Sequence, residues 1–325
     1  MSVMPIKSPR YLIIVATLIA LTPAISAVAS QESDEKATAP QERVRKPFSW
    51  NNPPSAEQSH PRMTHGTFTS PSMGIPIGYN IYLPTGYEED TYRDVSYPVI
   101  YFLHGGRPGS ESKSIGLVGN VHAAIESRQV RPIIFVWVNG GEVSHYNYGD
   151  SRGEDVFVNE LIPYIDSTYR TIDHRGGRAL QGFSQGGRGT TRIMFKHPEL
   201  FISAAPGGPG YGMERKIFEN HGVEQDTRFG GTGPALDFGE GNDAFSLARE
   251  YARQPTQPPL NILIWVGTNG FNYEVTLEYL DFLSGLGISA ERLVVPDVGH
   301  NSFELYEKRG TDLLRFHDQH WSGLE

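Results

Sequence analysis

A serine enclosed by glycines constrains this chain more than any other feature. Residues 178–187 read RALQGFSQGG and contain the pattern G-x-S-x-G, with Ser184 at its centre. In this pattern a strand turns directly into a helix, so the serine takes unfavourable backbone angles that hold its hydroxyl clear of the sheet. A side chain at Gly182 or Gly186 would collide across the turn, and Gly187 lets the helix pack close to the strand. The pattern also occurs by chance, so an apolar strand before it, a helix after it and a histidine late in the chain must support it.

Buried strands and helices alternate along the chain on both sides of this stretch. Unbroken apolar runs at 98–106 and 133–138 are typical of strands buried on both faces. Between them, apolar residues recur at helical spacing over 117–125, which predicts a right-handed strand–helix–strand crossover. The same reasoning predicts a half-buried strand at 77–83, helices over 157–165, 277–283 and 303–316, and strands at 179–183, 262–266 and 292–295. We therefore expect an α/β domain with a doubly wound, mostly parallel sheet, helices on both faces, and reacting residues at the carboxyl ends of the strands.

His300 directly follows the last predicted strand, at the sheet edge where Ser184 is expected. The chain has 11 histidines, most without evident chemistry, so an ordinary loop histidine is the rival interpretation. The order serine then histidine along the chain is that of hydrolases built on this kind of sheet. We therefore predict that His300 is the base that activates Ser184.

Composition narrows the possible partners. At 325 residues with 38% hydrophobic residues, the chain can bury one good-sized core. It contains no cysteine, which excludes disulfides, a thiol nucleophile, lipid attachment through cysteine and thiolate metal sites. The net charge of -9 becomes about -11 when the two basic residues of the N-terminal segment are subtracted. A negative chain is a poor partner for nucleic acid or anionic membranes, so a neutral or small-molecule partner is expected.

The N-terminal residues have the composition of an export signal. Lys7 and Arg10 precede an apolar stretch over 11–21, and residues 27–29 supply the small side chains of a cleavage site. Polar residues interrupt the apolar run before it comfortably spans a bilayer, which favours cleavage over an uncleaved membrane anchor. We therefore expect a signal peptide at 1–29, a secreted or periplasmic protein, a disordered polar linker at 30–62 and a catalytic domain at 63–325.

Five short stretches carry a family resemblance. They are 81–87 (IYLPTGY), 97–106 (YPVIYFLHGG), 160–165 (ELIPYI), 182–187 (GFSQGG) and 299–301 (GHN). In these stretches the chain resembles the α/β-hydrolase esterases grouped with esterase D, enterochelin esterase, feruloyl and acetylxylan esterases and the mycolyltransferases. The resemblance extends over residues 64–316 and implies the α/β-hydrolase fold and ester chemistry.

The resemblance assigns a role to each part of the site. Ser184 would attack an ester carbonyl, and His300 would take its proton and return it to the leaving alcohol. The oxyanion hole would use the backbone N–H groups of Gln185 and Gly106, while His104 would hold the loop in place. No cofactor and no metal is expected. His317 and His320 have a spacing that a metal site can use, but a solvated helix face is the simpler interpretation.

One position departs from the family pattern. The resemblance implies a triad aspartate in a Gly-Thr-x-Asp turn after the strand at 262–266, but residues 267–270 read GTNG. We predict that Glu274, at the start of the next helix, replaces it, because Gly270 leaves room for its longer side chain. The simpler alternative is that Glu274 only interacts favourably with the helix dipole. Other candidates are Asp237, Glu240 and Asp243 if the insertion folds over the site, Asn269 or Asn272 as neutral partners, and, ranked lower, Asp297.

Two classes of function fit these residues. The first is a secreted serine esterase acting on small-molecule or polysaccharide-linked esters, with acyl transfer as a mechanistic neighbour. The second is a non-catalytic descendant that binds a carbohydrate or ester, which the missing aspartate would explain. The insertion at 206–256 contains Tyr211, Phe218 and Phe229, which would either stack on a phenolic acyl group or sugar, or serve as loop anchors. Because no long apolar lid is evident, small acyl or hydroxycinnamoyl esters are expected to be preferred over long-chain lipids. The sequence does not choose between feruloyl, acetyl and siderophore esters.

Overall fold

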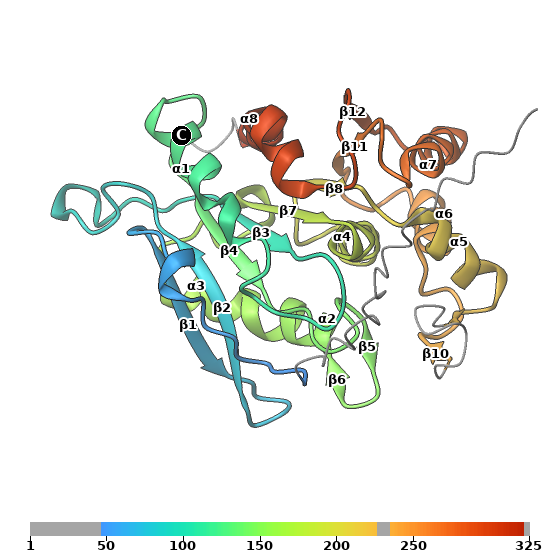
Figure 1. The fold of residues 1–325 in the computed structure, drawn as a ribbon, viewed down its shortest axis with the longest axis horizontal. Coiled ribbons are helices and arrows are strands. Elements are labelled where there is room, and N and C mark those ends of the chain that lie inside the picture. The colour runs from blue at the N-terminus through green and yellow to red at the C-terminus, as the bar shows by residue number, and fades with distance from the viewer. Residues whose placement is uncertain (1–46, 226–234, 322–325) are drawn as a thin grey trace, which may run out of the picture. The chain divides into compact units, whose positions relative to one another are not determined.

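In the computed structural model, an eight-stranded sheet runs through the described residues, 47–225 and 235–321 (Figure 1). The strand order is β1-β2-β4-β3-β7-β8-β11-β12. All neighbours from β4 to β12 are parallel, whereas β2 is antiparallel to both β1 and β4. The predicted doubly wound, mostly parallel sheet is therefore confirmed. The strands are β1 (Met63–Thr69), β2 (Pro76–Tyr82), β3 (Val99–Leu103), β4 (Ile134–Val138), β7 (Arg178–Phe183), β8 (Ser203–Gly207), β11 (Asn261–Gly267) and β12 (Glu291–Val295).

Helices cover both faces of this sheet. On one face, α1 (Val118–Glu126) and α8 (Ser302–His320) enclose a core that contains Phe102 and Trp265. On the other face, a second core joins the sheet to the π-helical η4 (Val156–Leu161), α3 (Ile162–Thr168), α4 (Gln185–Lys196), α6 (Ala244–Arg253) and α7 (Tyr273–Gly285), and α2 (Gly153–Asp155) directly precedes η4. Short elements complete the chain: η1 (Ala56–Gln58), η2 (Asp90–Tyr92), η3 (Ile115–Leu117), η5 (Arg175–Gly177), β5 (Asn147–Tyr148) and β6 (Ser151–Arg152). Within the described ranges, no helix combines the length and apolar character needed to cross a membrane.

Strand β8 is absent from the sequence predictions because its residues are small. Its sequence, SAAPG, lacks the β-branched and aromatic side chains that mark the other central strands. The structure requires a small residue at the end of β8. A Cβ atom on Gly207 would lie 2.0 Å from the indole of Trp265, which lies on the neighbouring strand β11. Strand β8 therefore fills the sheet between β7 and β11 with almost no side-chain volume.

The segment from Pro47 to Arg62 differs from the prediction. It was expected to belong to a disordered linker, but Pro47 onward forms one unit with the domain. Gly78 N–H donates to the carbonyl of Trp50 at 2.7 Å, and the Asn139 amide donates to the carbonyl of Ser49 at 3.1 Å. The segment has few apolar side chains, and its attachment combines the packing of Trp50 against the core with hydrogen bonds to its backbone that composition does not reveal. The predicted signal peptide and residues 30–46 lie outside the described residues.

The insertion between β8 and β11 contains α5 (Tyr211–Glu219), β9 (Val223–Glu224), β10 (Leu236–Asp237) and α6. Tyr211 is buried, stacks on Tyr279 with ring centroids 3.7 Å apart, and shares a 3.0 Å hydrogen bond with Thr191. Tyr211 is thus a core anchor, the second of the two roles predicted for the insertion aromatics. Phe218 lies beneath the guanidinium of Arg249, and Phe229 lies outside the described residues.

Candidate active site

Ser184 lies between the end of β7 and the start of α4, with φ 60° and ψ -114°. These are the strained angles that the sequence pattern predicts for a nucleophile at a sharp strand-to-helix turn. The turn is held from both sides, because Ser184 N–H donates to the carbonyl of Gly207 at 2.8 Å and its own carbonyl accepts from Arg188 N–H at 3.1 Å. A Cβ atom on Gly186 would lie 1.9 Å from the carbonyl oxygen of Leu103. Glycine is therefore obligatory where α4 begins against β3.

His300 contacts the nucleophile directly. Its Nε2 atom lies 2.8 Å from Ser184 Oγ, although the two residues are 116 positions apart in the sequence. His300 follows β12, and the next residue, Asn301, caps α8 by accepting from Phe303 N–H at 3.0 Å. The loop that carries the histidine is therefore fixed at its helical end, and the structure brings together the two residues predicted as nucleophile and base.

The other nitrogen of the His300 ring has no partner. Within the described residues, the buried Nδ1 atom forms no hydrogen bond. Aromatic rings flank the imidazole instead: Phe183 with centroids 4.7 Å apart and Phe271 with centroids 4.5 Å apart. Burial lowers the pKa of His300 below its ordinary value. The shift favours the neutral form of the ring, which is the form that a base requires.

The residues predicted for the oxyanion hole, Gln185 and Gly106, lie on both sides of the serine. Gln185 is the first residue of α4, where the backbone N–H has no partner within the helix. Gly105 lies against the serine, since a Cβ atom on it would be 3.3 Å from Ser184 Cβ. Gly106 follows with φ 68°, and Ser144 Oγ donates to its carbonyl at 2.6 Å. In the described part of the chain, Gly106 N–H has no acceptor.

His104 holds this loop, as predicted. Its Nε2 atom accepts from the backbone N–H groups of Gly140 at 3.1 Å and Ser110 at 3.3 Å. Nδ1 therefore carries the hydrogen and donates to the carbonyl of Gly105 at 3.1 Å. Burial, together with neighbouring His145 and Lys113, keeps the pKa of His104 well below its ordinary value, so it stays neutral and acts as a support.

Four buried charged side chains and one tyrosine, here called the charged cluster, support Gln185. It consists of Arg107, Arg188, Glu214, Glu224 and Tyr146. Arg188 donates to Gln185 Oε1 at 3.0 Å, to Glu214 at 2.6 Å and to Glu224 at 3.0 Å. Arg107 donates to both carboxylate oxygens of Glu224, each at 3.0 Å, and Tyr146 donates to Glu214 at 2.7 Å. Sequence patterns did not single out these residues, because they come from five separate segments.

The charged cluster joins the insertion to the site. Glu224 lies on β9, Glu214 on α5, Arg107 follows the oxyanion loop and Arg188 lies on α4. Burial by itself would raise the pKa of Glu224, but Arg188 and Arg107 outweigh it and hold that pKa below its ordinary value. The insertion therefore fixes the geometry of the oxyanion side through ionised, paired groups.

The structure does not bring Glu274 to His300. Glu274 lies in the first turn of α7 with an exposed side chain, and within the described residues its carboxylate forms no hydrogen bond or ion pair. The position is that of a helix-start carboxylate, the simpler of the two interpretations. The other acidic candidates are occupied elsewhere or exposed: Asp237 accepts from Gly239 N–H, Glu240 pairs with His221, Asp243 caps α6 and Asp297 is exposed.

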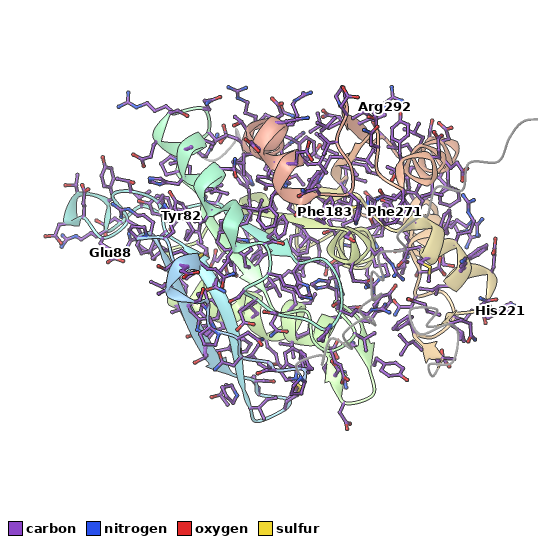
Figure 2. All side chains as sticks on the ribbon, viewed as in Figure 1. Tyr82, Glu88, Phe183, His221, Phe271 and Arg292 are labelled. Carbon is purple, nitrogen blue, oxygen red and sulfur yellow. The ribbon has the colours of Figure 1, made fainter. Side chains whose placement is uncertain are left out.

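The sequence predicted no role in the site for two exposed aromatic side chains that lie near it. Phe271 is 81% exposed although it contacts His300, and Phe303, at the start of α8, is 50% exposed. Figure 2 labels Phe271 together with Phe183, the other ring that flanks His300. Only their positions in the sequence could have indicated that they lie near the site, because Phe271 follows the GTNG turn and Phe303 lies three residues after His300.

The residues considered as metal ligands are part of the packing instead. His317 is fully buried, and its Nδ1 atom lies 2.8 Å from Ser203 Oγ, so the predicted solvated face is wrong for this residue. His320 Nδ1 bonds to the carbonyl of Phe316 at 2.7 Å. Across residues 47–225 and 235–321, no three His, Asp or Glu side chains converge in a way that could hold a metal ion.

Comparisons with known proteins identify a family for this chain. The Esterase family model matches residues 70–277. An esterase of Mycobacterium tuberculosis is 29% identical over 154 residues, which cover 46% of this chain and 32% of that protein. An endo-1,4-beta-xylanase/feruloyl esterase of Xylanibacter ruminicola is 31% identical over 152 residues, 44% of this chain and 21% of that protein. The matches thus span a third or less of these relatives.

The fold also matches solved structures. A ferulic acid esterase superposes with a TM-score of 0.62 at 19% identity, covering 79% of this chain and 98% of the other. At this identity the likeness establishes the fold, which is that of the α/β-hydrolases. The family model matches residues 70–277, so this chain belongs to the esterase family.

Proposed function

We propose that the protein is a secreted serine esterase that works through an acyl-serine intermediate. The observation that carries the proposal is the 2.8 Å contact between Ser184 Oγ and His300 Nε2 at a strained strand-to-helix turn. Ser184 Oγ attacks the ester carbonyl carbon while its proton passes to Nε2. Collapse of the tetrahedral intermediate expels the alcohol, which takes that proton. Water then attacks the acyl-serine with His300 again as base, and the carboxylic acid leaves.

The backbone N–H groups of Gln185 and Gly106 stabilise the negative charge of the tetrahedral intermediate. Such a donor contributes about 3 to 4 kcal/mol to the transition state when it is held in advance. Support for this assignment comes from the charged cluster behind Gln185 and the fixed loop of His104. Both donors are therefore held before substrate arrives.

For the substrate, we propose feruloyl or acetyl esters attached to plant polysaccharide. The ferulic acid esterase with the same fold and the xylanase/feruloyl esterase relative support this choice. The exposed ring of Phe271 beside His300 supports it too, because an aromatic face can stack on a phenolic ring or a sugar. Export through residues 1–29 would place the enzyme where such esters occur.

The catalytic part of the proposal is tested with Ser184→Ala and p-nitrophenyl acetate. We expect kcat/KM to fall by at least about a thousandfold, because the nucleophile is lost. Labelling by a fluorophosphonate reagent should be abolished in the same variant. Equal hydrolysis by the wild type and Ser184→Ala would instead support the non-catalytic, ester-binding alternative.

The substrate part is tested with methyl ferulate, acetylated xylan and p-nitrophenyl palmitate. We expect the first two to be turned over faster than the palmitate. Phe271→Ala should raise KM for methyl ferulate by about tenfold, which is 1.4 kcal/mol of lost stacking, and leave p-nitrophenyl acetate nearly unchanged. Phe218→Ala, which removes a partly exposed aromatic on α5, is the matched control. Faster turnover of palmitate than of acetate would exclude the proposed substrate class.

A further inference from the structure

Two buried polar atoms near the catalytic histidine lack partners. Within the described residues, neither His300 Nδ1 nor Asn272 Oδ1 forms a hydrogen bond. Asn272 immediately precedes α7 and is 1% exposed. Its amide nitrogen donates to the carbonyl of Pro209 at 3.2 Å, which fixes the orientation of the amide and leaves Oδ1 as its free end. Buried polar atoms are rarely left without a partner, so each of these two atoms requires an explanation.

The two atoms are chemically complementary. Because Nε2 accepts the Ser184 hydroxyl hydrogen, the neutral ring carries its own hydrogen on Nδ1, which makes Nδ1 a donor. Asn272 Oδ1 is an acceptor. A catalytic histidine needs an acceptor at Nδ1 to select its tautomer and ring orientation. Asn272 has the atom that this role requires.

Gly270 links the two positions. A Cβ atom on Gly270 would lie 2.9 Å from Asn272 Oδ1 and 3.9 Å from the carbonyl carbon of Gly299, the residue before His300. The side chain of an aspartate at this position would therefore start against Asn272 Oδ1. With glycine there, the space between the GTNG turn and the His300 loop is open to the amide.

We infer that Asn272 is the positioning residue of His300, with Oδ1 accepting a hydrogen bond from Nδ1–H directly after a small side-chain rotation, or through one water molecule. This inference rests on the proposed function, because it assumes that His300 acts as the base. Asn272 orients the ring as the missing aspartate would, but supplies no negative charge. Glu274 is not needed for this role, which agrees with its exposed position.

The test compares Asn272→Asp with Asn272→Ala. Both variants lose the donor to Pro209, but only aspartate keeps an acceptor near Nδ1. A purely structural role of Asn272 therefore predicts equal losses in the two variants. We expect Asn272→Ala to lower kcat at least thirtyfold with KM changed less than threefold, and Asn272→Asp to equal or exceed the wild-type kcat. Asn269→Ala, at an exposed position of the same turn, is the control and should stay within twofold.

A second measurement does not depend on activity. Nitrogen-15 NMR of labelled histidine reports which ring nitrogen of His300 carries the hydrogen, and at what pH the ring is protonated. We expect the Nδ1–H tautomer in the wild type and in Asn272→Asp, a mixture of tautomers in Asn272→Ala, and a pKa raised by about one unit or more in Asn272→Asp. A wild-type pKa in Asn272→Asp, a wild-type tautomer in Asn272→Ala, or equal losses of kcat in the two variants would overturn the inference.

These measurements also separate the inference from the proposed function. If Ser184→Ala keeps activity, the proposed function fails, but a tautomer that depends on residue 272 still supports the contact. If Ser184→Ala abolishes activity and the tautomer is independent of residue 272, the function stands and the inference fails. Should Asn272→Ala not fold, the NMR titration of Asn272→Asp decides, because a buried carboxylate at Nδ1 must raise the pKa of the ring.

Discussion

The two sides of Ser184 differ in charge. On the oxyanion side, Gln185 is held by the charged cluster, in which two arginines and two glutamates are buried and paired. On the histidine side, the rings of Phe183 and Phe271 flank His300, and within the described residues no charged side chain bonds to its ring. The oxyanion side is therefore fixed by strong ionic contacts, whereas the base is positioned by packing and, as we infer, one amide. The geometry is therefore most tightly determined on the side where the proposed reaction would develop negative charge.

The charged cluster should contribute more to the free energy of unfolding than an ion pair at the surface does. Replacing Glu214 with alanine removes the acceptor of Arg188, Tyr146 OH and Ala244 N–H, and leaves a buried guanidinium with less neutralisation. We expect a loss of about 3 to 5 kcal/mol in the free energy of unfolding, measured by urea denaturation. Glu278→Ala, which removes a partly exposed ion pair with Arg215, should cost less than about 1 kcal/mol. Equal costs in the two variants would contradict the view that the cluster holds the oxyanion side.

Adding a negative charge beside His300 should reduce the difference in charge between the two sides of Ser184. Gly270→Asp restores the aspartate of the Gly-Thr-x-Asp turn, provided that the Asn272 amide turns away from the new side chain. We expect kcat for p-nitrophenyl acetate to rise at least about tenfold, or 1.4 kcal/mol in the barrier, because the imidazolium is stabilised. Gly285→Asp adds the same charge on α7 in open space and is the control. No gain at residue 270 would mean that the neutral histidine side lacks nothing for catalysis.

The pH dependence of activity should show that no charged group lies beside the His300 ring. His300 must be neutral to act as a base, and burial lowers its pKa below 6.5. We therefore expect activity to be lost as the pH falls through the lowered pKa of His300. A pH profile of kcat/KM should place the acid limb below pH 6.5. An acid limb above this value would indicate an unrecognised carboxylate beside the ring.

The smallest effect is expected at Glu274, the acid predicted from the sequence. Its side chain is exposed, so Glu274→Gln should change kcat less than about twofold. Glu278→Gln on the same helix serves as the comparison. A several-hundredfold loss in Glu274→Gln, with unchanged thermal unfolding, would restore Glu274 as the triad acid and contradict the role inferred for Asn272.

The sequence predicted those features that local chemistry determines. Apolar runs marked β3, β4 and β11, and the glycine pattern marked the turn at Ser184, because these depend on neighbouring residues. Strand β8 was missed because its small residues are selected by the indole of Trp265, which comes from a distant segment. Likewise, the cluster and the placement of Asn272 depend on contacts between separate loops, and no spacing along the chain encodes them.

The segment from Pro47 to Arg62 has a consequence for the order of folding. Its partners lie far ahead in the chain: Asn52 bonds to Glu111, 59 residues later, and Ser49 to Asn139, 90 residues later. A chain synthesised from its N-terminus exposes this segment first but supplies the last of these partners, Asn139, only after β4 has emerged. The attachment of the segment is therefore completed late, over strands that have already been synthesised. Truncation at residue 62 would leave Gly78 N–H and the Asn139 amide without these acceptors, so the shortest version that folds fully should begin at or before Pro47.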